Sequence, residues 1–268
     1  MPNAKDIVRR KEKFLLIGPT GSGKTTQFLT LPGKKFMYIF DPNALNTIAG
    51  HDIDYELYTP DILNMNVVSL TKGVGDKSPS HQVPMTYVDF ERDFESKIAS
   101  GFFNNYDVLG FDSMTTLADI VMDRVLYLNG RFGKQPEQPD WSAQINTIKN
   151  IFRTATSIDI TFFATAHKEL KQDELTKKIE YQIVLPGQLR VKLPLLFSEI
   201  YHTEVVLDDK LAHTYRIQTK PDRYNSVARC TLGLDQYVDV TVHDMKNPTA
   251  YGLGKILTEH PSRKVDVK

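Results

Sequence analysis

A glycine-rich turn between an apolar run and a lysine constrains this chain more than any other stretch. Residues 14–26 read FLLIGPTGSGKTT, which predicts a buried strand, a turn and the start of a helix. Glycines at this spacing let successive backbone N–H groups point inward at phosphate oxygens, and the following helix presents its positive N-terminal end. The stretch fills every fixed position of G-x-x-x-x-G-K-[ST]. It therefore predicts a phosphate-binding loop.

Each part of this loop has an expected task. Lys24 would reach the β- and γ-phosphates of ATP, and the Thr25 hydroxyl would ligate Mg²⁺. The alternative is a glycine-rich turn that only joins a strand to a helix. However, the strand and the helix that nucleotide binding requires can both be recognised in the sequence. The residues expected to contact nucleotide are Gly18, Pro19, Thr20, Gly21, Ser22, Gly23, Lys24, Thr25 and Thr26.

Composition excludes several other classes of protein. Lys plus Arg equals Asp plus Glu, 33 against 33 in 268 residues, so no overall charge draws the chain to nucleic acid or membrane. The single cysteine, Cys230, excludes an internal disulfide and suits a reducing compartment. No apolar run is long enough to cross a bilayer, and the polar first residues are not typical of a signal peptide. We expect a cytoplasmic protein.

Apolar runs alternate with helical periodicity along most of the chain. This pattern predicts an α/β fold, a mostly parallel central sheet flanked by helices, with an antiparallel extension near the C-terminus. A hairpin is expected within residues 168–183, and a weak strand at 66–70 followed by a long loop. Strands are expected at 35–40, 108–111, 158–166, 199–207 and 212–220, and helices at 25–31, 44–49, 89–100, 115–128, 141–156 and 249–258. We divide the chain into an N-terminal arm (1–12), an ATPase core (13–235) and a C-terminal extension with a tail (236–268).

Three polar residues follow the expected parallel strands. Because ligands bind beyond the carboxyl ends of such strands, we expect Asp41, Asp112 and His167 to meet the phosphate loop. Asp112 follows the apolar run 108–111, as does the aspartate that holds Mg²⁺ in many nucleotide hydrolases. Asp41 would orient water, or would only cap a turn with Pro42. His167 would contact the γ-phosphate, or would be a half-buried, hydrogen-bonded histidine.

Five segments taken together resemble the RecA-like ATPases of bacteriophages. They are GPTGSGKTT, FDS at 111–113, TAH at 165–167, the LPGQLRVKLP segment and TKPDR at 219–223. The sequence is most similar to the phage AAA-type group related to RadA and RecA cores, which includes single-strand annealing and recombination ATPases. The similarity covers about residues 13–232. The first two segments occur in many nucleotide hydrolases, whereas the last three in this order are more specific.

The resemblance implies a RecA-like core, ATP and Mg²⁺ as ligands, and action on single-stranded DNA as a ring or filament. In such assemblies the nucleotide lies between subunits, and Lys220 and Arg223 match positions from which a neighbour contacts the γ-phosphate. Alternatively, these two residues have no such role and are merely exposed on a strand edge. RecA-like proteins usually carry a glutamate where this chain has Asp41. This difference predicts slow hydrolysis, or a nucleotide-gated binding protein.

Two segments are candidates for DNA contact. The loop 129–140 offers Arg131, Phe132 and Lys134, and cations near aromatic rings suit a single strand. The hairpin carries Lys168, Lys171, Lys177, Lys178 and Tyr181, but Glu169, Asp173, Glu174 and Glu180 are interleaved with them. A solvated charged surface is therefore an equal alternative there.

Three functions stay open from the sequence. The first is a DNA-stimulated ATPase of phage recombination or annealing. The second is a nucleotide-gated binding module for DNA or protein with little turnover. The third is a small-molecule phosphotransferase, against which stands the lack of an arginine cluster beside the expected crevice.

Overall fold

The structure, a computed structural model, describes residues 11–60, 83–172, 174, 177–207 and 211–260. Within these residues an eight-stranded sheet has the order β10-β9-β8-β1-β5-β4-β2-β3, and β6 and β7 form a separate hairpin. The strands are β1 (Lys13–Ile17), β2 (Lys35–Ile39), β3 (Asp54–Leu57), β4 (Val108–Asp112), β5 (Thr161–Ala166), β6 (Lys168–Gln172), β7 (Ile179–Ile183), β8 (Glu199–Leu207), β9 (His213–Gln218) and β10 (Tyr237–Asp239).

The sheet confirms the predicted fold class. Strands β3, β2, β4, β5, β1 and β8 run parallel, and β9 and β10 add antiparallel strands beyond β8. The strand that precedes the phosphate loop lies at the centre, since Leu15 pairs with Ala164 of β5 and with Ile200 of β8. All five residues of β1 are buried. A continuous apolar run is expected for a strand that is covered on both faces.

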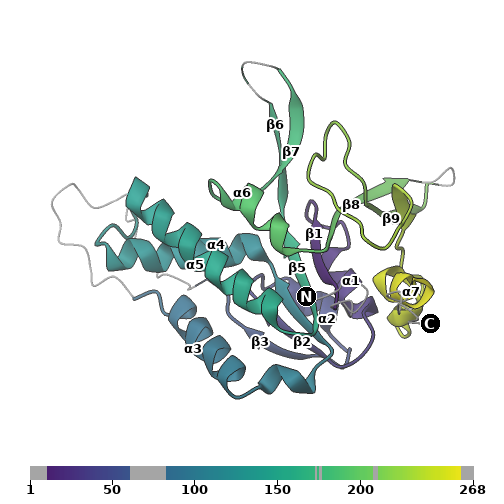
Figure 1. Ribbon diagram of the computed structural model, residues 1–268, viewed down its shortest axis with the longest axis horizontal. Helices are drawn as coiled ribbons and strands as arrows, with labels where there is room; N and C mark the ends of the chain where they lie inside the picture. Colours follow the sequence, from purple (N-terminus) through teal and green to yellow (C-terminus); the bar gives the residue numbers. More distant parts are fainter. Residues whose placement is uncertain (1–10, 61–82, 173, 175–176, 208–210, 261–268) are drawn as a thin grey trace, which may run out of the picture.

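Helices cover both faces of the sheet (Figure 1). One core packs around α1 (Lys24–Thr30), α2 (Ala44–Ile48) and α7 (Gly252–Glu259), and includes Phe14 and Leu16 of β1. The other contains Leu15 and Ile17 with residues of α3, α4, α5 and α6. The alternation of side chains along β1 thus separates the two cores. The bounds are α3 (Thr86–Ala99), α4 (Met114–Leu128), α5 (Gln138–Ser157) and α6 (Leu189–Lys192), with 3₁₀ turns at Phe102–Asn105, Pro194–Leu196 and Pro248–Ala250.

The structure differs from the sequence expectations in several elements. Strands β3 and β10 and helix α6 were not expected, and α3 and α5 begin three residues before 89 and 141. Pro139 lies in the first turn of α5, where its missing N–H costs nothing, and Glu137 and Asp140 form a reciprocal cap. A proline that suggested a loop therefore helps to start a helix.

Some expectations concern residues outside the described part of the chain. The weak strand at 66–70 lies there, as do residues 1–10 of the expected arm and the last eight residues. Among the described helices, none combines the length and the apolar character needed to span a bilayer.

Candidate nucleotide-binding site

The phosphate loop joins β1 to α1 and curls as its glycines allow. Gly21 and Gly23 have positive φ angles of 77° and 80°, which side chains disfavour. A side chain at Gly23 would also come within 2.9 Å of the Tyr215 ring. The Lys24 ammonium donates to the carbonyl oxygens of Gly18 (2.9 Å) and Pro19 (2.7 Å). Burial lowers the pKa of Lys24 to about 8, although the carboxylates of Asp112 and Asp41 oppose that shift.

Thr25 and Asp112 meet as the sequence predicted. The Thr25 hydroxyl donates to Oδ2 of Asp112 over 2.6 Å, and the Thr165 hydroxyl donates to Oδ1. Burial raises the pKa of Asp112, while these two hydrogen bonds and the Lys24 charge act in the opposite direction. Thr165 lies on β5, between β4 and β1. The sequence analysis did not predict its hydrogen bond to Asp112. It fixes the carboxylate that faces the phosphate loop.

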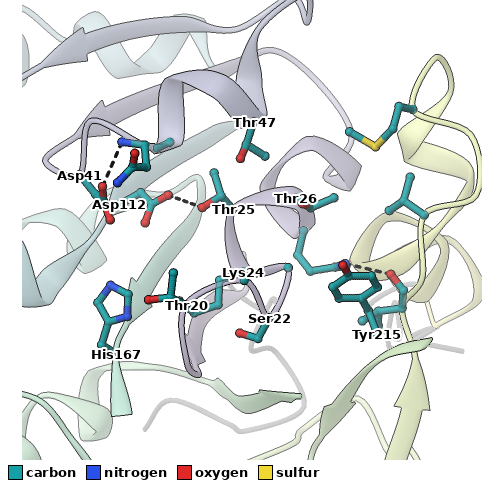
Figure 2. A pocket seen from close by; sticks show the side chains of 18 residues that line it. Thr20, Ser22, Lys24, Thr25, Thr26, Asp41, Thr47, Asp112, His167 and Tyr215 are labelled. Carbon is teal, nitrogen blue, oxygen red and sulfur yellow. Dashed lines mark hydrogen bonds between the residues drawn. The ribbon is translucent and has the colours of Figure 1, made fainter. Parts of the chain in front are cut away.

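Asp41 and His167 also line this pocket, at the ends of β2 and β5 (Figure 2). Asp41 Oδ1 accepts the backbone N–H of Asn43 (3.0 Å), so the turn-capping alternative is observed in addition to the pocket placement. The His167 backbone N–H donates to the Thr115 hydroxyl. Burial and the Lys24 charge lower the pKa of His167, which favours a neutral imidazole.

The pocket has a volume of about 370 Å³ and two chemically different ends. The phosphate loop, Asp41, Asp112 and His167 line the polar end. Tyr215 of β9 lies on the other side (Figure 2), and three residues of the C-terminal extension, Val240, Val242 and Met245, also line the pocket. The sequence analysis missed these four residues because they lie about 190 positions or more after the loop. Only the return of β9 along β8 brings them back.

Gln27 holds the extension against the phosphate-loop helix. Its Nε2 donates to the Val240 carbonyl (2.9 Å), and its Oε1 accepts the backbone N–H of Leu253 (3.2 Å). The side chain is buried. One residue of α1 thus fixes both a wall of the pocket and the start of α7.

Lys220 and Arg223 do not line the pocket. Both are exposed on the loop 219–228 that follows β9. Arg223 donates to the Tyr224 hydroxyl, and its guanidinium lies 4.4 Å from the centre of that ring. The loop borders the hairpin, since the Tyr181 N–H donates to the Tyr224 carbonyl over 2.7 Å.

Of the residues considered for DNA contact, Arg131 has an internal partner. Its guanidinium donates to both carboxylate oxygens of buried Asp140, over 2.8 and 2.6 Å. On the hairpin, Lys171 pairs with Glu169 (3.1 Å) and Lys178 with Glu180 (2.7 Å). For these two lysines the ion pairs agree with the alternative of a charged surface.

The opposite face of the hairpin has another character. Leu170 pairs with Tyr181 and Gln172 with Ile179, so these residues share the face that does not carry Glu169 and Lys171. Leu170 is 58% and Ile179 42% exposed. The hairpin projects from the body of the molecule (Figure 1). It thus presents the apolar side chains of Leu170 and Ile179 to solvent, with half-buried Tyr181 on the same face.

The donor set fits magnesium and a nucleoside triphosphate. A hydroxyl and a carboxylate supply oxygen ligands, which Mg²⁺ prefers, and Mg²⁺ usually takes its remaining ligands from phosphates and water. No cluster of three or more His, Cys, Asp or Glu side chains suited to a metal occurs within the described residues. The Lys24 ammonium is a strong hydrogen-bond donor, and two carbonyl oxygens of the loop hold it beside the loop. Two oxygen ligands and a cation fit a metal shared with phosphate.

Comparison with solved structures finds similar chains of low sequence identity. The flagellar accessory protein FlaH from Methanocaldococcus jannaschii is 11% identical, with a TM-score of 0.42, over 88% of this chain and 87% of that one. A KaiC-like protein from Pyrococcus horikoshii OT3 is 12% identical, with a TM-score of 0.43, over 90% of this chain and 88% of that one. A search of the curated proteins finds no match.

A family model identifies the domain. The model described as AAA domain matches residues 10–229, from the end of the expected arm through β1, the phosphate loop, β4, β5 and β9. The match includes Lys24, Thr25, Asp112 and His167, and covers most of the chain. The chain therefore belongs to the AAA domain family and carries an AAA-type P-loop ATPase domain.

Proposed function

We propose that the chain hydrolyses ATP and acts on single-stranded DNA in phage-type recombination or annealing, as a homo-oligomeric ring or filament. The observation that carries the catalytic part is the contact between Thr25 and Asp112 next to Lys24, in one pocket with Asp41 and His167. AAA-type membership supports ATP as the nucleotide. The DNA and assembly parts rest on the sequence resemblance and on the surfaces described above.

The residues of the pocket divide the work of hydrolysis. Lys24 would leave the Gly18 and Pro19 carbonyls and bind the β- and γ-phosphates, and Thr25 and Asp112 would hold Mg²⁺. The metal, when bound, neutralises charge on the phosphates. Asp41 would accept a hydrogen bond from the attacking water. That water oxygen would bond to the γ-phosphorus as the bond to the β–γ bridging oxygen breaks, and the water would give a proton to Asp41, which yields ADP and phosphate.

The apolar end of the pocket suits the base. Tyr215, Val240, Val242 and Met245 offer a ring and aliphatic side chains to a flat heterocycle. Apolar walls with a few polar groups are typical of cofactor sites. With the base there, the phosphates would lie at the phosphate loop and the N-terminus of α1, near Asp112 and His167.

The surfaces beyond the pocket support a single-stranded partner and a neighbouring subunit. The hairpin face with Leu170, Tyr181 and Ile179 offers stacking area, which binds bases of any sequence. Lys220 and Arg223 are exposed cations outside their own pocket. We propose that they contact the γ-phosphate of a neighbour and stabilise its transition state.

One observation favours a second function, a nucleotide-gated binding module. One Asp41 oxygen is engaged by the Asn43 N–H, which leaves the other for water. A carboxylate shorter than the usual glutamate, and partly used in a turn, would orient water poorly. Such a protein would bind ATP and change its affinity for DNA or protein with little turnover.

The test is ATP turnover by the purified full chain with and without oligothymidylate. We expect measurable hydrolysis that rises with the oligonucleotide. Tight ATP binding with negligible turnover in both conditions would favour the binding module instead. Transfer of phosphate to an added nucleoside would favour a phosphotransferase.

A further inference from the structure

A line of three hydrogen bonds, the central one buried and the outer two part-buried, connects the base of the hairpin to the loop that carries Lys220 and Arg223. Lys168 Nζ lies 3.5 Å from Asn225 Oδ1, Asn225 Nδ2 donates to Gln218 Oε1 over 2.7 Å, and Gln218 Nε2 donates to the Lys220 carbonyl over 2.8 Å. Asn225 and Gln218 are both buried, at 7% and 2% exposure. Each amide uses its oxygen and its nitrogen, so neither can rotate without losing a partner.

The first residue of this line adjoins the nucleotide pocket. Lys168 directly follows His167, which lines the pocket, and it begins β6. The Lys168 ammonium lies 4.3 Å from the centre of the Tyr181 ring on β7. Movement of the hairpin or of the end of β5 would therefore move this ammonium relative to Asn225.

The last residues of the line are held within a rigid loop. Asp222 Oδ1 accepts the backbone N–H groups of Tyr224 (2.8 Å) and Asn225 (2.6 Å). The Val227 carbonyl bonds to Nε2 of buried His202 over 2.7 Å. A loop bonded in this way moves as a unit, and Arg223 moves with it.

We infer that Asn225 is a positioning residue that couples the hairpin to the cationic loop. When single-stranded DNA engages the hairpin, the shift of Lys168 is passed through Asn225 and Gln218 to the Lys220 backbone, in addition to the direct bond from the Tyr181 N–H to the Tyr224 carbonyl, and so to Arg223. The inference rests on the proposed function, because it requires DNA on the hairpin and a γ-phosphate as the target of Arg223. Asn225 itself touches neither ligand.

The experiment compares Asn225→Leu with the wild-type chain. Leucine keeps the size of the side chain but removes both hydrogen bonds. Turnover is measured without and with saturating oligothymidylate, and the affinities for ATP and for fluorescent oligothymidylate are measured separately. We expect the DNA stimulation ratio to fall about fivefold or more, since couplings of this kind are typically worth that factor. Both affinities and the basal rate should stay close to wild type, which a general loss of structure would not allow.

Controls separate the possible outcomes. Ser226→Ala, at the exposed neighbouring position, should keep the wild-type ratio. If Asn225→Leu does not fold, Gln218→Met breaks the same line and should give the same loss. A folded variant of either kind with an undiminished ratio would overturn the inference while leaving the proposed function intact. Absence of stimulation in the wild-type chain would contradict the proposed function, and the inference with it.

Discussion

Asp41 takes part in a turn and also lines the nucleotide pocket. Its Oδ1 caps the turn through the Asn43 N–H, and its side chain lines the pocket near Lys24. Asn at this position would keep the turn acceptor and the shape but could not accept a proton. We predict that Asp41→Asn lowers turnover on the order of a hundredfold, with ATP affinity within a few-fold of wild type. Steady-state kinetics with a separate binding titration tests this, and wild-type turnover in the variant would exclude Asp41 as the base.

His202 makes stability depend on pH. It is 3% exposed, burial lowers its pKa to about 4, and its Nε2 bonds to the Val227 carbonyl. An unfolded histidine titrates near about 6.5, so between these values the unfolded chain binds a proton that the folded chain does not. The stability this residue provides is complete above the unfolded pKa and is lost as the pH falls toward the folded one. The full loss is about 3 kcal/mol.

A glutamine at this position tests that assignment. The Nε2 of glutamine can take the place of the ring nitrogen and does not titrate. We predict that His202→Gln reduces the drop in unfolding free energy between about pH 7 and about pH 5 by up to about 2 kcal/mol. Denaturant titrations at the two pH values measure it, with His213→Gln at an exposed position as the control. If the unfolding free energy falls equally in His202→Gln and in wild type, His202 does not cause the pH dependence.

At the scale of elements, α7 docks on the phosphate-loop helix through glycine. A side chain at Gly254 would come within 2.0 Å of the Thr30 carbonyl oxygen, and its N–H bonds to the Thr30 hydroxyl. In a free helix, Gly→Ala stabilises by about 1 kcal/mol. Here the added methyl meets backbone, so we predict that Gly254→Ala destabilises the protein by about 2 kcal/mol.

Thermal unfolding with Lys255→Ala as the exposed neighbour checks that prediction. The Lys255 variant should unfold as the wild type does, whereas Gly254→Ala should unfold at a lower temperature. The extension that Gln27 anchors forms the apolar end of the pocket, so Gly254→Ala should weaken ATP binding as well. A stabilised Gly254→Ala variant would mean that α7 is not packed this closely.

The sequence predicted elements best where their signals were long and local. The phosphate loop, the buried strands and the meeting of Thr25 with Asp112 follow from motif spacing and from the position of parallel strand ends. The four-residue β3 has mostly exposed residues and no clear alternation, so it gave no strand signal. Tyr215 and Val240 line the pocket only because strands distant in sequence pair in the sheet. No local sequence pattern predicts such a contact.

At the scale of the whole molecule, the pocket lacks the two cations that the resemblance places against the γ-phosphate of a neighbouring chain. Lys220 and Arg223 are exposed and do not line the pocket. We predict that Arg223→Ala lowers turnover about a thousandfold or more and that an isolated subunit still binds ATP. Turnover and ATP binding by the purified variant check this, and wild-type turnover would show that Arg223 does not act on ATP.

Mixing variants tests whether Arg223 acts between subunits. A Lys24→Ala subunit still offers Arg223, and an Arg223→Ala subunit still offers a phosphate loop. In an equal mixture about a quarter of head-to-tail interfaces would pair the two intact parts. Turnover should therefore rise well above that of either variant alone. A mixture that stays at the sum of its parts, although the variants co-assemble, would contradict a role in trans.

The central claim is that the phosphate loop with Lys24, Thr25 and Asp112 binds the triphosphate of ATP. Its most direct test is equilibrium binding of ATP with Mg²⁺ to wild type, to Lys24→Ala, and to Lys34→Ala as a control at an exposed lysine. We predict that Lys24→Ala weakens binding by at least about tenfold, the usual minimum for a lost hydrogen bond to a charged group, and that Lys34→Ala binds as wild type does. Unchanged affinity in Lys24→Ala would contradict the assignment of the site.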